Sequence, residues 1–117
     1  MSAKLYDEVT LPLRLHSTAN LREHWAAKAK RTKHHRQTAK LMCKDFGLPC
    51  IVTITRIAPR QLDDDNLASC CKATRDGVAD RLGIDDRDPR VQWRYKQAKG
   101  KPKEYAVRVT FERTEEI

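Results

Sequence analysis

Four segments of the chain alternate apolar and polar residues, and this pattern predicts four β-strands. The segments are 4–16, 50–59, 90–98 and 104–113. The second is the clearest, because its β-branched residues are dense and Pro59 closes it. Pro12 interrupts the first segment, which argues for a strand at the edge of a sheet or for a break within the strand.

Two other segments, 21–46 and 66–82, have apolar residues at three-to-four spacing, or at seven where the stripe of the first is broken, which predicts two helices. The expected apolar stripe of the first helix is Leu21, Trp25, Ala29, Thr32, Ala39, Met42 and Phe46. That of the second helix is Leu67, Cys71, Thr74, Val78 and Leu82. Gly47 and Gly83 are placed to end the two helices, since glycine is common just beyond a helix C-terminus.

The resulting order, β-α-β-α-β-β, predicts an α+β fold with two main helices against one small mixed sheet. A chain of 117 residues suits a single domain, which we place at 1–117. There is no apolar run of the roughly 18 residues that a bilayer span requires. The first residues also lack the apolar core of a signal peptide, so we expect a cytoplasmic protein without a membrane partner.

The chain has a formal net charge of +8, and a strongly basic domain usually binds a polyanion. Charge alone does not separate DNA, RNA and an acidic membrane. Most of the candidate contact residues lie on the first predicted helix, and their alternative interpretation is a solvated polar face. They are Lys28, Lys30, Arg31, Lys33, Arg36 and Lys40, with Arg60 preceding the second helix.

Acidic residues nevertheless gather in two clusters, DDDN at 63–66 and DDRD at 85–88. In extended backbone Asp63 and Asp65 point the same way, because alternate side chains share a face. The helix that follows places Ser69, Lys72 and Asp76 on the same face as Asp65.

Mg²⁺ takes oxygen ligands, usually one or two protein carboxylates with water and phosphate. Such an ion, bound by Asp63, Asp65 and one residue of the second cluster, would polarise a phosphoryl oxygen and lower the pKa of an attacking water. A nearby lysine would offset the charge that develops on the phosphate. The competing interpretation is structural: Asp63 to Asp65 form a helix N-cap, and the second cluster forms a turn.

The four cysteines show no C-x-x-C spacing, so we expect buried free thiols rather than a zinc site. Neither acidic cluster fits an EF-hand loop, and the four glycines form no nucleotide-binding motif. We therefore expect no small-molecule substrate.

The run LDDDNL, followed by KATRDGVADRLGIDD and a strand, resembles the RusA family of Holliday junction endonucleases from phages and prophages. The resemblance covers about residues 59 to 96. It implies that Asp63, Asp65 and Asp86 are the metal-binding catalytic carboxylates and that Lys72 is the catalytic lysine. In the family this lysine follows the second aspartate by four residues, the position of Ser69 here, whereas Lys72 follows Asp65 by seven.

The resemblance further implies a homodimeric, Mg²⁺-dependent endodeoxyribonuclease, with Mn²⁺ as a possible substitute. Such an enzyme resolves Holliday junctions or other branched DNA by paired symmetric nicking, in recombination, repair or phage DNA processing. It would act on the nucleoid of a bacterial or phage-infected cell, with the basic residues contacting DNA. Two alternatives stay open: a non-catalytic, basic nucleic-acid-binding module, and a related nuclease acting on flaps. The joint presence of Asp63, Asp65, Lys72 and Asp86 favours catalysis over plain binding.

Overall fold

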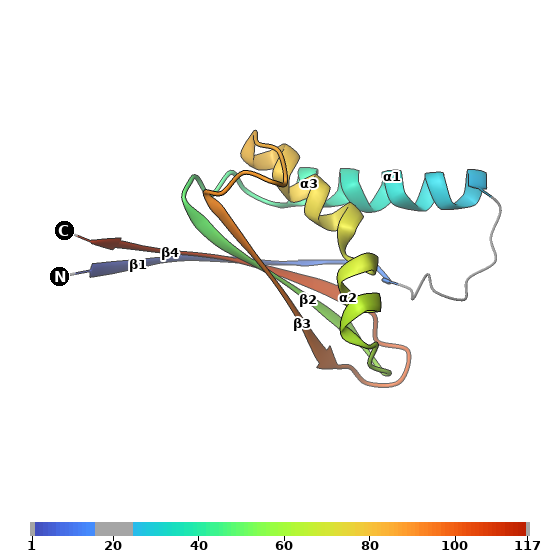
Figure 1. Cartoon of the computed structure of the whole chain (residues 1–117). Helices are drawn as coiled ribbons and strands as arrows, with labels where there is room; N and C mark the ends of the chain where they lie inside the picture. The colour runs from blue at the N-terminus through green and yellow to red at the C-terminus, as the bar shows by residue number, and fades with distance from the viewer. Residues whose placement is uncertain (1, 16–24, 117) are drawn as a thin grey trace.

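The computed structural model of the chain describes residues 2–15 and 25–116. They form a single α+β domain, as the sequence predicts, with α1 and α3 over one face of a mixed sheet (Figure 1). The elements in chain order are β1 (Ser2–Leu11), α1 (Trp25–Met42), β2 (Cys50–Ala58), α2 (Asp64–Cys70), α3 (Lys72–Leu82), β3 (Val91–Lys99) and β4 (Ala106–Glu116).

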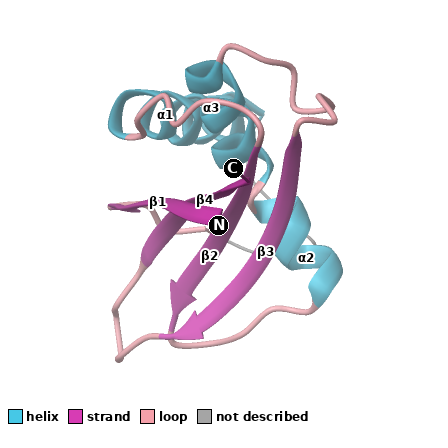
Figure 2. Ribbon diagram, turned by 90° about the vertical axis from the view of Figure 1, so that its left-hand side faces the viewer, coloured by secondary structure: helices cyan, strands magenta, loops and turns pink. Residues whose placement is uncertain are grey.

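The sheet has the strand order β1-β4-β2-β3, and Figure 2 shows the strands side by side. β4 runs antiparallel to both β1 and β2, whereas β2 and β3 are parallel. Parallel neighbours require a crossover connection, and α2 with α3 supply it. β1 lies at one edge and ends at Leu11, directly before Pro12, which confirms the edge position expected for this strand.

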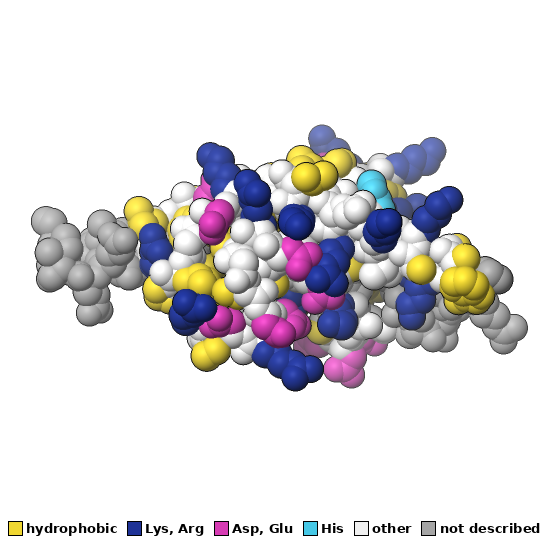
Figure 3. Space-filling view, turned by 90° about the horizontal axis from the view of Figure 1, so that it is seen from above, with side chains coloured by type: hydrophobic (Ala, Val, Ile, Leu, Met, Phe, Trp, Pro, Cys, Tyr) yellow, Lys and Arg dark blue, Asp and Glu magenta, His cyan; other side chains and the backbone are white. Residues whose placement is uncertain are grey.

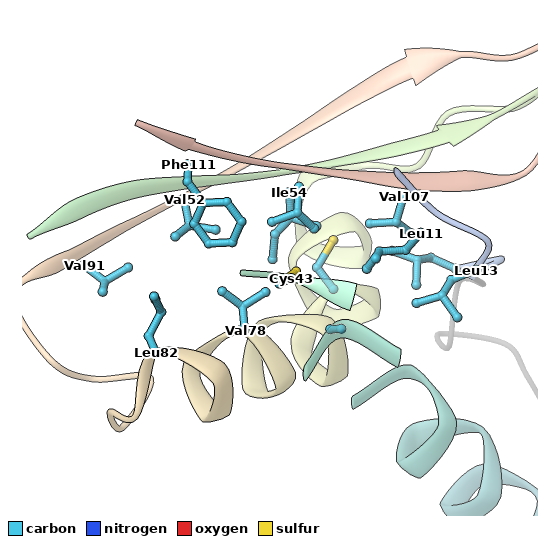
Figure 4. Close-up of a cluster of buried hydrophobic side chains, with 14 of the residues drawn as sticks. Leu11, Leu13, Cys43, Val52, Ile54, Val78, Leu82, Val91, Val107 and Phe111 are labelled. Carbon is cyan, nitrogen blue, oxygen red and sulfur yellow. The ribbon is translucent and has the colours of Figure 1, made fainter. Parts of the chain in front are cut away.

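The core lies between the sheet and α3, where apolar side chains from both sides meet (Figure 4). Alternate residues of β2 and β4 supply the sheet side, among them Ile54, Val109 and Phe111, all fully buried. The predicted apolar stripe of the second helical segment is also buried, from Leu67 to Leu82. Each fully buried aliphatic side chain contributes about 1.5–3 kcal/mol, so this stripe fixes the helices on the sheet. All four cysteines are buried and free, as expected.

The second predicted helix is two helices in the structure, because the segment breaks at Cys71. α2 begins at Asp64, two residues before the predicted start, and α3 ends at Leu82, with Gly83 in the left-handed conformation as expected. The two helices pack on different partners, α2 against β3 and α3 against α1. The apolar stripe continues across the break without glycine or proline, so its pattern does not reveal the division.

The first helix is shorter than the predicted 21–46, and Leu21 lies outside the described residues. α1 ends at Met42, where the Arg81 side chain of α3 binds the carbonyl of the next residue, Cys43 (Nε to O 3.0 Å). Gly47, expected to end the helix, instead has a positive φ within the following loop. The loop returns to the sheet there, since Phe46 stacks on Phe111 with 5.6 Å between ring centroids.

The apolar stripe expected on α1 is largely exposed, which corrects the prediction. Trp25 is 77% exposed and Met42 44%, and the buried residues of the helix are His35 and Ala39. α1 packs mainly on α3 and has few contacts with the sheet, at β1, and the two helices meet closely at Gly77. This contact involves a narrow side of α1, so few of its apolar residues are covered.

An ion pair ties α1 to α3 beside this contact. The guanidinium of Arg36 binds both carboxylate oxygens of Asp80, at 2.7 and 2.9 Å. This geometry is the bidentate one that gives Arg–carboxylate pairs their specificity. Hydrogen bonding to Arg36 lowers the pKa of Asp80 below its ordinary value.

We expect Asp80→Asn to lower the free energy of unfolding at pH 7 by about 0.5–1 kcal/mol, the value of a partly exposed ion pair. Because the folded-state pKa of Asp80 is lowered, the pair stabilises the protein above the unfolded pKa of about 3.9 and loses this effect as pH falls through the folded-state value. Urea unfolding at pH 7 and below pH 4 should show the difference between wild type and variant shrinking with acid. Asp45→Asn, a change at an exposed position after α1, is the control. A difference that stays constant with pH would show that the pair does not stabilise the fold.

Candidate nucleic-acid interface and acidic site

The DDDN cluster forms the N-terminus of α2. Asp63 is the N-cap, with extended backbone, and its Oδ1 accepts a hydrogen bond from the Asn66 N–H at 2.9 Å. Asp64 and Asp65 occupy the first turn, and all three aspartates are exposed. The positive end of the helix dipole favours negative charge here. The capping interpretation of Asp63 is therefore confirmed. The cap uses one carboxylate oxygen, so capping and metal ligation are compatible at this residue.

A side-chain amide from β3 fixes the chain just before this cluster. The Leu62 N–H donates to Oε1 of Gln97 at 2.8 Å, and Nε2 of Gln97 donates to the Leu62 carbonyl at 2.7 Å. Gln97 thus pairs with the backbone as a neighbouring strand would. The start of α2 is consequently anchored to the C-terminal end of β3.

The second acidic cluster forms the turn between α3 and β3, as its turn-like composition predicts. Oδ1 of Asp85 accepts a hydrogen bond from the Arg87 N–H at 2.9 Å, and this bond lowers the pKa of Asp85. Asp88 binds both the backbone and the guanidinium of Arg90, which lowers the pKa of Asp88 to about 2. These two carboxylates are therefore engaged within the turn.

Asp86 of the same turn lies against Arg75 of α3, a residue that the sequence interpretation did not single out. Nε of Arg75 is 3.4 Å from Oδ2 of Asp86, and its Nη2 donates to the Asp86 carbonyl at 3.0 Å. The same guanidinium donates to the Tyr95 hydroxyl at 2.7 Å and lies 5.0 Å from the centre of the Trp93 ring. Trp93 and Tyr95 are thus partly buried around this arginine.

The two acidic clusters are anchored at different positions along β3. Gln97 binds the residue before Asp63, whereas the Trp93 indole donates to the Asp86 carbonyl at 3.0 Å. Four residues of strand separate these anchors, or roughly 13 Å. Within residues 5–15 and 25–113, whose side chains the structure describes, no three His, Cys, Asp or Glu side chains converge in a group that could hold a metal ion.

The structure therefore keeps Asp63 and Asp65 together on one helix start and does not bring Asp86 to them. The donor set at the helix start still suits Mg²⁺, because that ion commonly uses only one or two protein carboxylates. The remaining positions would be filled by water and phosphate oxygens. Asp63 and Asp65 are the residues that would hold the ion.

A cleft of about 240 Å³ separates α1 from α2 and α3. Cations from both walls line it, with Lys28 and Arg31 on α1 and Lys72 on α3. Figure 3, which views the helical face, shows Lys and Arg side chains spread over this surface with acidic side chains between them. The other residues of the lining are Thr32, His35, Ser69, Cys70, Ala73 and Asp76.

Lys72 and Ser69, the two positions compared in the resemblance to the RusA family, both line this cleft. The Lys72 ammonium lies 3.6 Å from Oδ1 of Asp76, and its side chain is 71% exposed. An exposed pair of this kind contributes little stability and is easily exchanged for another anion. Lys72 is therefore available to a phosphate in the cleft.

The seven basic residues expected to contact DNA lie on several parts of the surface. Lys28 and Arg31 line the cleft, Lys28 also lines a neighbouring hollow on α1 with Lys33 and Arg36, and Lys30 and Lys40 are exposed on the same helix. Arg36 is paired with Asp80, and Arg60 follows β2 at the far end of the sheet.

None of the helices in the described ranges is long and apolar enough to cross a bilayer. No protein-family model matches the chain. A curated protein of Xylella fastidiosa (strain Temecula1 / ATCC 700964), named only as an uncharacterized protein, is 38% identical over 82 residues. The match takes in 58% of this chain and 52% of the relative, so the chain spans about half the length of that protein. The name of that protein states no activity.

Proposed function

We propose that this protein is a Mg²⁺-dependent endodeoxyribonuclease of the RusA type that nicks branched DNA, four-way junctions above all. One observation supports this most directly. The exposed carboxylates Asp63 and Asp65 stand at the start of the same helical segment whose later residues, Ser69 and Lys72, line a basic cleft. A carboxylate pair alone would repel DNA, and the cations of the cleft offset this repulsion.

In this proposal Asp63 and Asp65 would hold the metal ion, and the ion would supply Lewis-acid activation of the phosphate and of an attacking water. Lys72 offsets the negative charge that develops on the phosphate during hydrolysis, and a preorganised cation is effective in that role. Asp86 is not assigned to the metal ion, because the structure pairs its carboxylate with Arg75. Lys28 and Arg31 bind backbone phosphates across the cleft.

Resolution of a four-way junction requires two symmetric nicks, so we propose a homodimer whose two-fold axis matches that of the junction. The same proposal places the protein in the cytoplasm, on the nucleoid of a bacterial or phage-infected cell. Flaps are a second branched substrate that the same site chemistry would accept.

A non-catalytic nucleic-acid-binding module is the second candidate. The capping bond of Asp63 and the turn bonds of Asp85 and Asp88 favour it, because each gives an acidic residue a structural role. It gives Asp65 only the favourable interaction of a first-turn carboxylate with the helix dipole, a role that Asp64 fills equally well.

The deciding experiment incubates the purified protein with a synthetic four-way junction, a flap and a linear duplex, each with Mg²⁺, Mn²⁺ or EDTA. We expect metal-dependent nicks at symmetric positions on opposite strands of the junction, no cutting in EDTA and little cutting of the duplex. Cutting confined to the flap would identify the flap, and not the junction, as the substrate. Tight junction binding without cleavage in either metal would reject the nuclease and leave the binding module.

A further inference from the structure

A second basic pocket, separate from the cleft, lies at the C-terminal end of β2. It encloses about 260 Å³ and is lined by Arg14, Leu15, Arg56, Pro59, Arg60, Leu62 and Tyr105. Figures 1 and 2 both place the end of β2 beside the segment that leads into β4. Three of the lining residues are arginines, and the described part of the chain contributes no carboxylate to the lining.

Arg56 is the residue that distinguishes this pocket from an ordinary basic surface. Alternate residues of β2 face the core, so Arg56 lies on the same side of the strand as Val52 and Ile54. Its side chain is only 7% exposed. Nε donates to the Leu15 carbonyl at 3.1 Å, and Nη1 donates to the Arg60 carbonyl at 2.6 Å. A guanidinium has five N–H groups, so these two bonds leave three.

Both acceptors of Arg56 are neutral carbonyl oxygens, and no described carboxylate forms an ion pair with it. A buried charge is costly unless it is paired, and buried arginines are normally matched by an anion. Arg56 is therefore a buried positive charge at the wall of an open pocket, and the residues that the structure describes supply no counter-ion for it.

The two other arginines add further positive charge to the pocket. Arg14 lies over the Tyr105 ring, with its guanidinium carbon 4.0 Å from the ring centre, so an aromatic face fixes its position. Arg60 lines the pocket from the loop whose carbonyl binds Arg56. Like charges brought into one pocket repel each other, and an anion bound among them removes that repulsion. Arginine forks suit the oxygens of a phosphate in particular.

We propose that this pocket is a phosphate-binding subsite built by Arg14, Arg56 and Arg60. Leu62 lines it and is followed directly by Asp63, so a phosphate held here lies next to the start of α2. A backbone phosphate of the strand engaged by Asp63 and Asp65 is the source we assign. That choice of source rests on the proposed nuclease function, whereas the binding of phosphate itself does not.

Thermal unfolding with inorganic phosphate, against chloride at equal ionic strength, tests the pocket without metal, DNA or cleavage. We expect phosphate to raise the melting temperature of the wild-type protein in a saturable manner. Arg60→Gln should weaken this binding about tenfold, as expected for the loss of one charge-assisted contact. Arg94→Gln, on the exposed face of β3, should leave it unchanged.

Arg56→Met separates a binding role from a structural one. The variant removes a buried charge but also the two hydrogen bonds to the Leu15 and Arg60 carbonyls, so its phosphate response is compared with its own phosphate-free melting temperature, and this response should be lost. A folded Arg56→Met protein that responds to phosphate as wild type does would instead assign Arg56 a purely structural role. An equal phosphate response in wild type and both pocket variants would reject the subsite, and the bound phosphate would be an adventitious ion only.

A short single-stranded oligonucleotide identifies the source of the phosphate. Competition between the oligonucleotide and inorganic phosphate, lost in Arg60→Gln, supports a DNA phosphate. Phosphate binding without such competition would overturn the DNA assignment. The phosphate response is measured without DNA. A protein that binds phosphate in this pocket but does not cut junctions would therefore support the pocket and reject the nuclease proposal.

Discussion

Gly77→Ala is expected to destabilise the protein, although alanine is the better helix former. A Cβ atom at this position would lie 2.2 Å from the carbonyl oxygen of Arg36 and 2.8 Å from the Cβ of Ala39. Both neighbours belong to α1, and a backbone oxygen cannot move without moving its helix. The overlap should cost about 1–3 kcal/mol or more, against a helix-propensity gain of at most about 1 kcal/mol. Urea unfolding should show a net loss of roughly 2 kcal/mol.

Gly83→Ala is the matched control for this change. Nothing lies within 4 Å of a Cβ at Gly83, and its φ of +73° makes backbone strain the sole penalty. The expected cost is about 1–2 kcal/mol, without a change in how α1 packs. Gly77→Val should be worse than Gly77→Ala, because its additional methyl groups would meet the same α1 neighbours. A neutral or stabilising Gly77→Ala would show that α1 and α3 are further apart than in this structure.

The strands and the α3 face could be predicted from the sequence because their burial is periodic. Val107, Val109 and Phe111 alternate along β4 and are all fully buried. Thr74 and Val78 repeat on the buried side of α3 in the same way. The sheet and α3 contact each other through side chains, and a side-chain contact leaves a pattern in the sequence.

The packing of α1 could not be predicted in this way, because its closest contact is through backbone. Gly77 approaches the Arg36 carbonyl, and Arg36 itself turns outward to Asp80. Apolar residues on α1 are consequently poor indicators of burial, as Leu41 shows at 80% exposure.

The candidate site was predictable where the chemistry is local. Asp63 caps the helix that directly follows it, and the bond joins residues only three positions apart in the chain. The partnership of Asp86 with Arg75 depends on how the turn after α3 returns to β3, which the spacing of acidic residues does not specify. Arg56 did leave a signal, since an arginine in register with Val52 and Ile54 is charged where the strand period demands an apolar residue.

Asp65→Asn is expected to abolish junction cleavage while junction binding is kept or strengthened. The amide removes one of the two carboxylates that would hold the metal ion, and loss of one strong electrostatic contact to a transition state lowers rates by about 10²–10³. It also removes a negative charge that repels phosphate, so affinity should not fall. Cleavage under single-turnover conditions with Mg²⁺ and gel-shift binding in EDTA measure the two effects separately.

Asp64→Asn is the matched control, because it makes the same change one residue away in the same turn. Both aspartates are exposed and neither is the cap, so the two variants should be equally stable and should lose the same favourable contact with the helix dipole. If the metal is bound by alternate carboxylates, Asp64→Asn cuts junctions at close to the wild-type rate. Equal losses in both variants would mean that the charge of the helix start matters rather than ligation by Asp65. Unchanged cleavage in Asp65→Asn would remove this residue from the active site altogether.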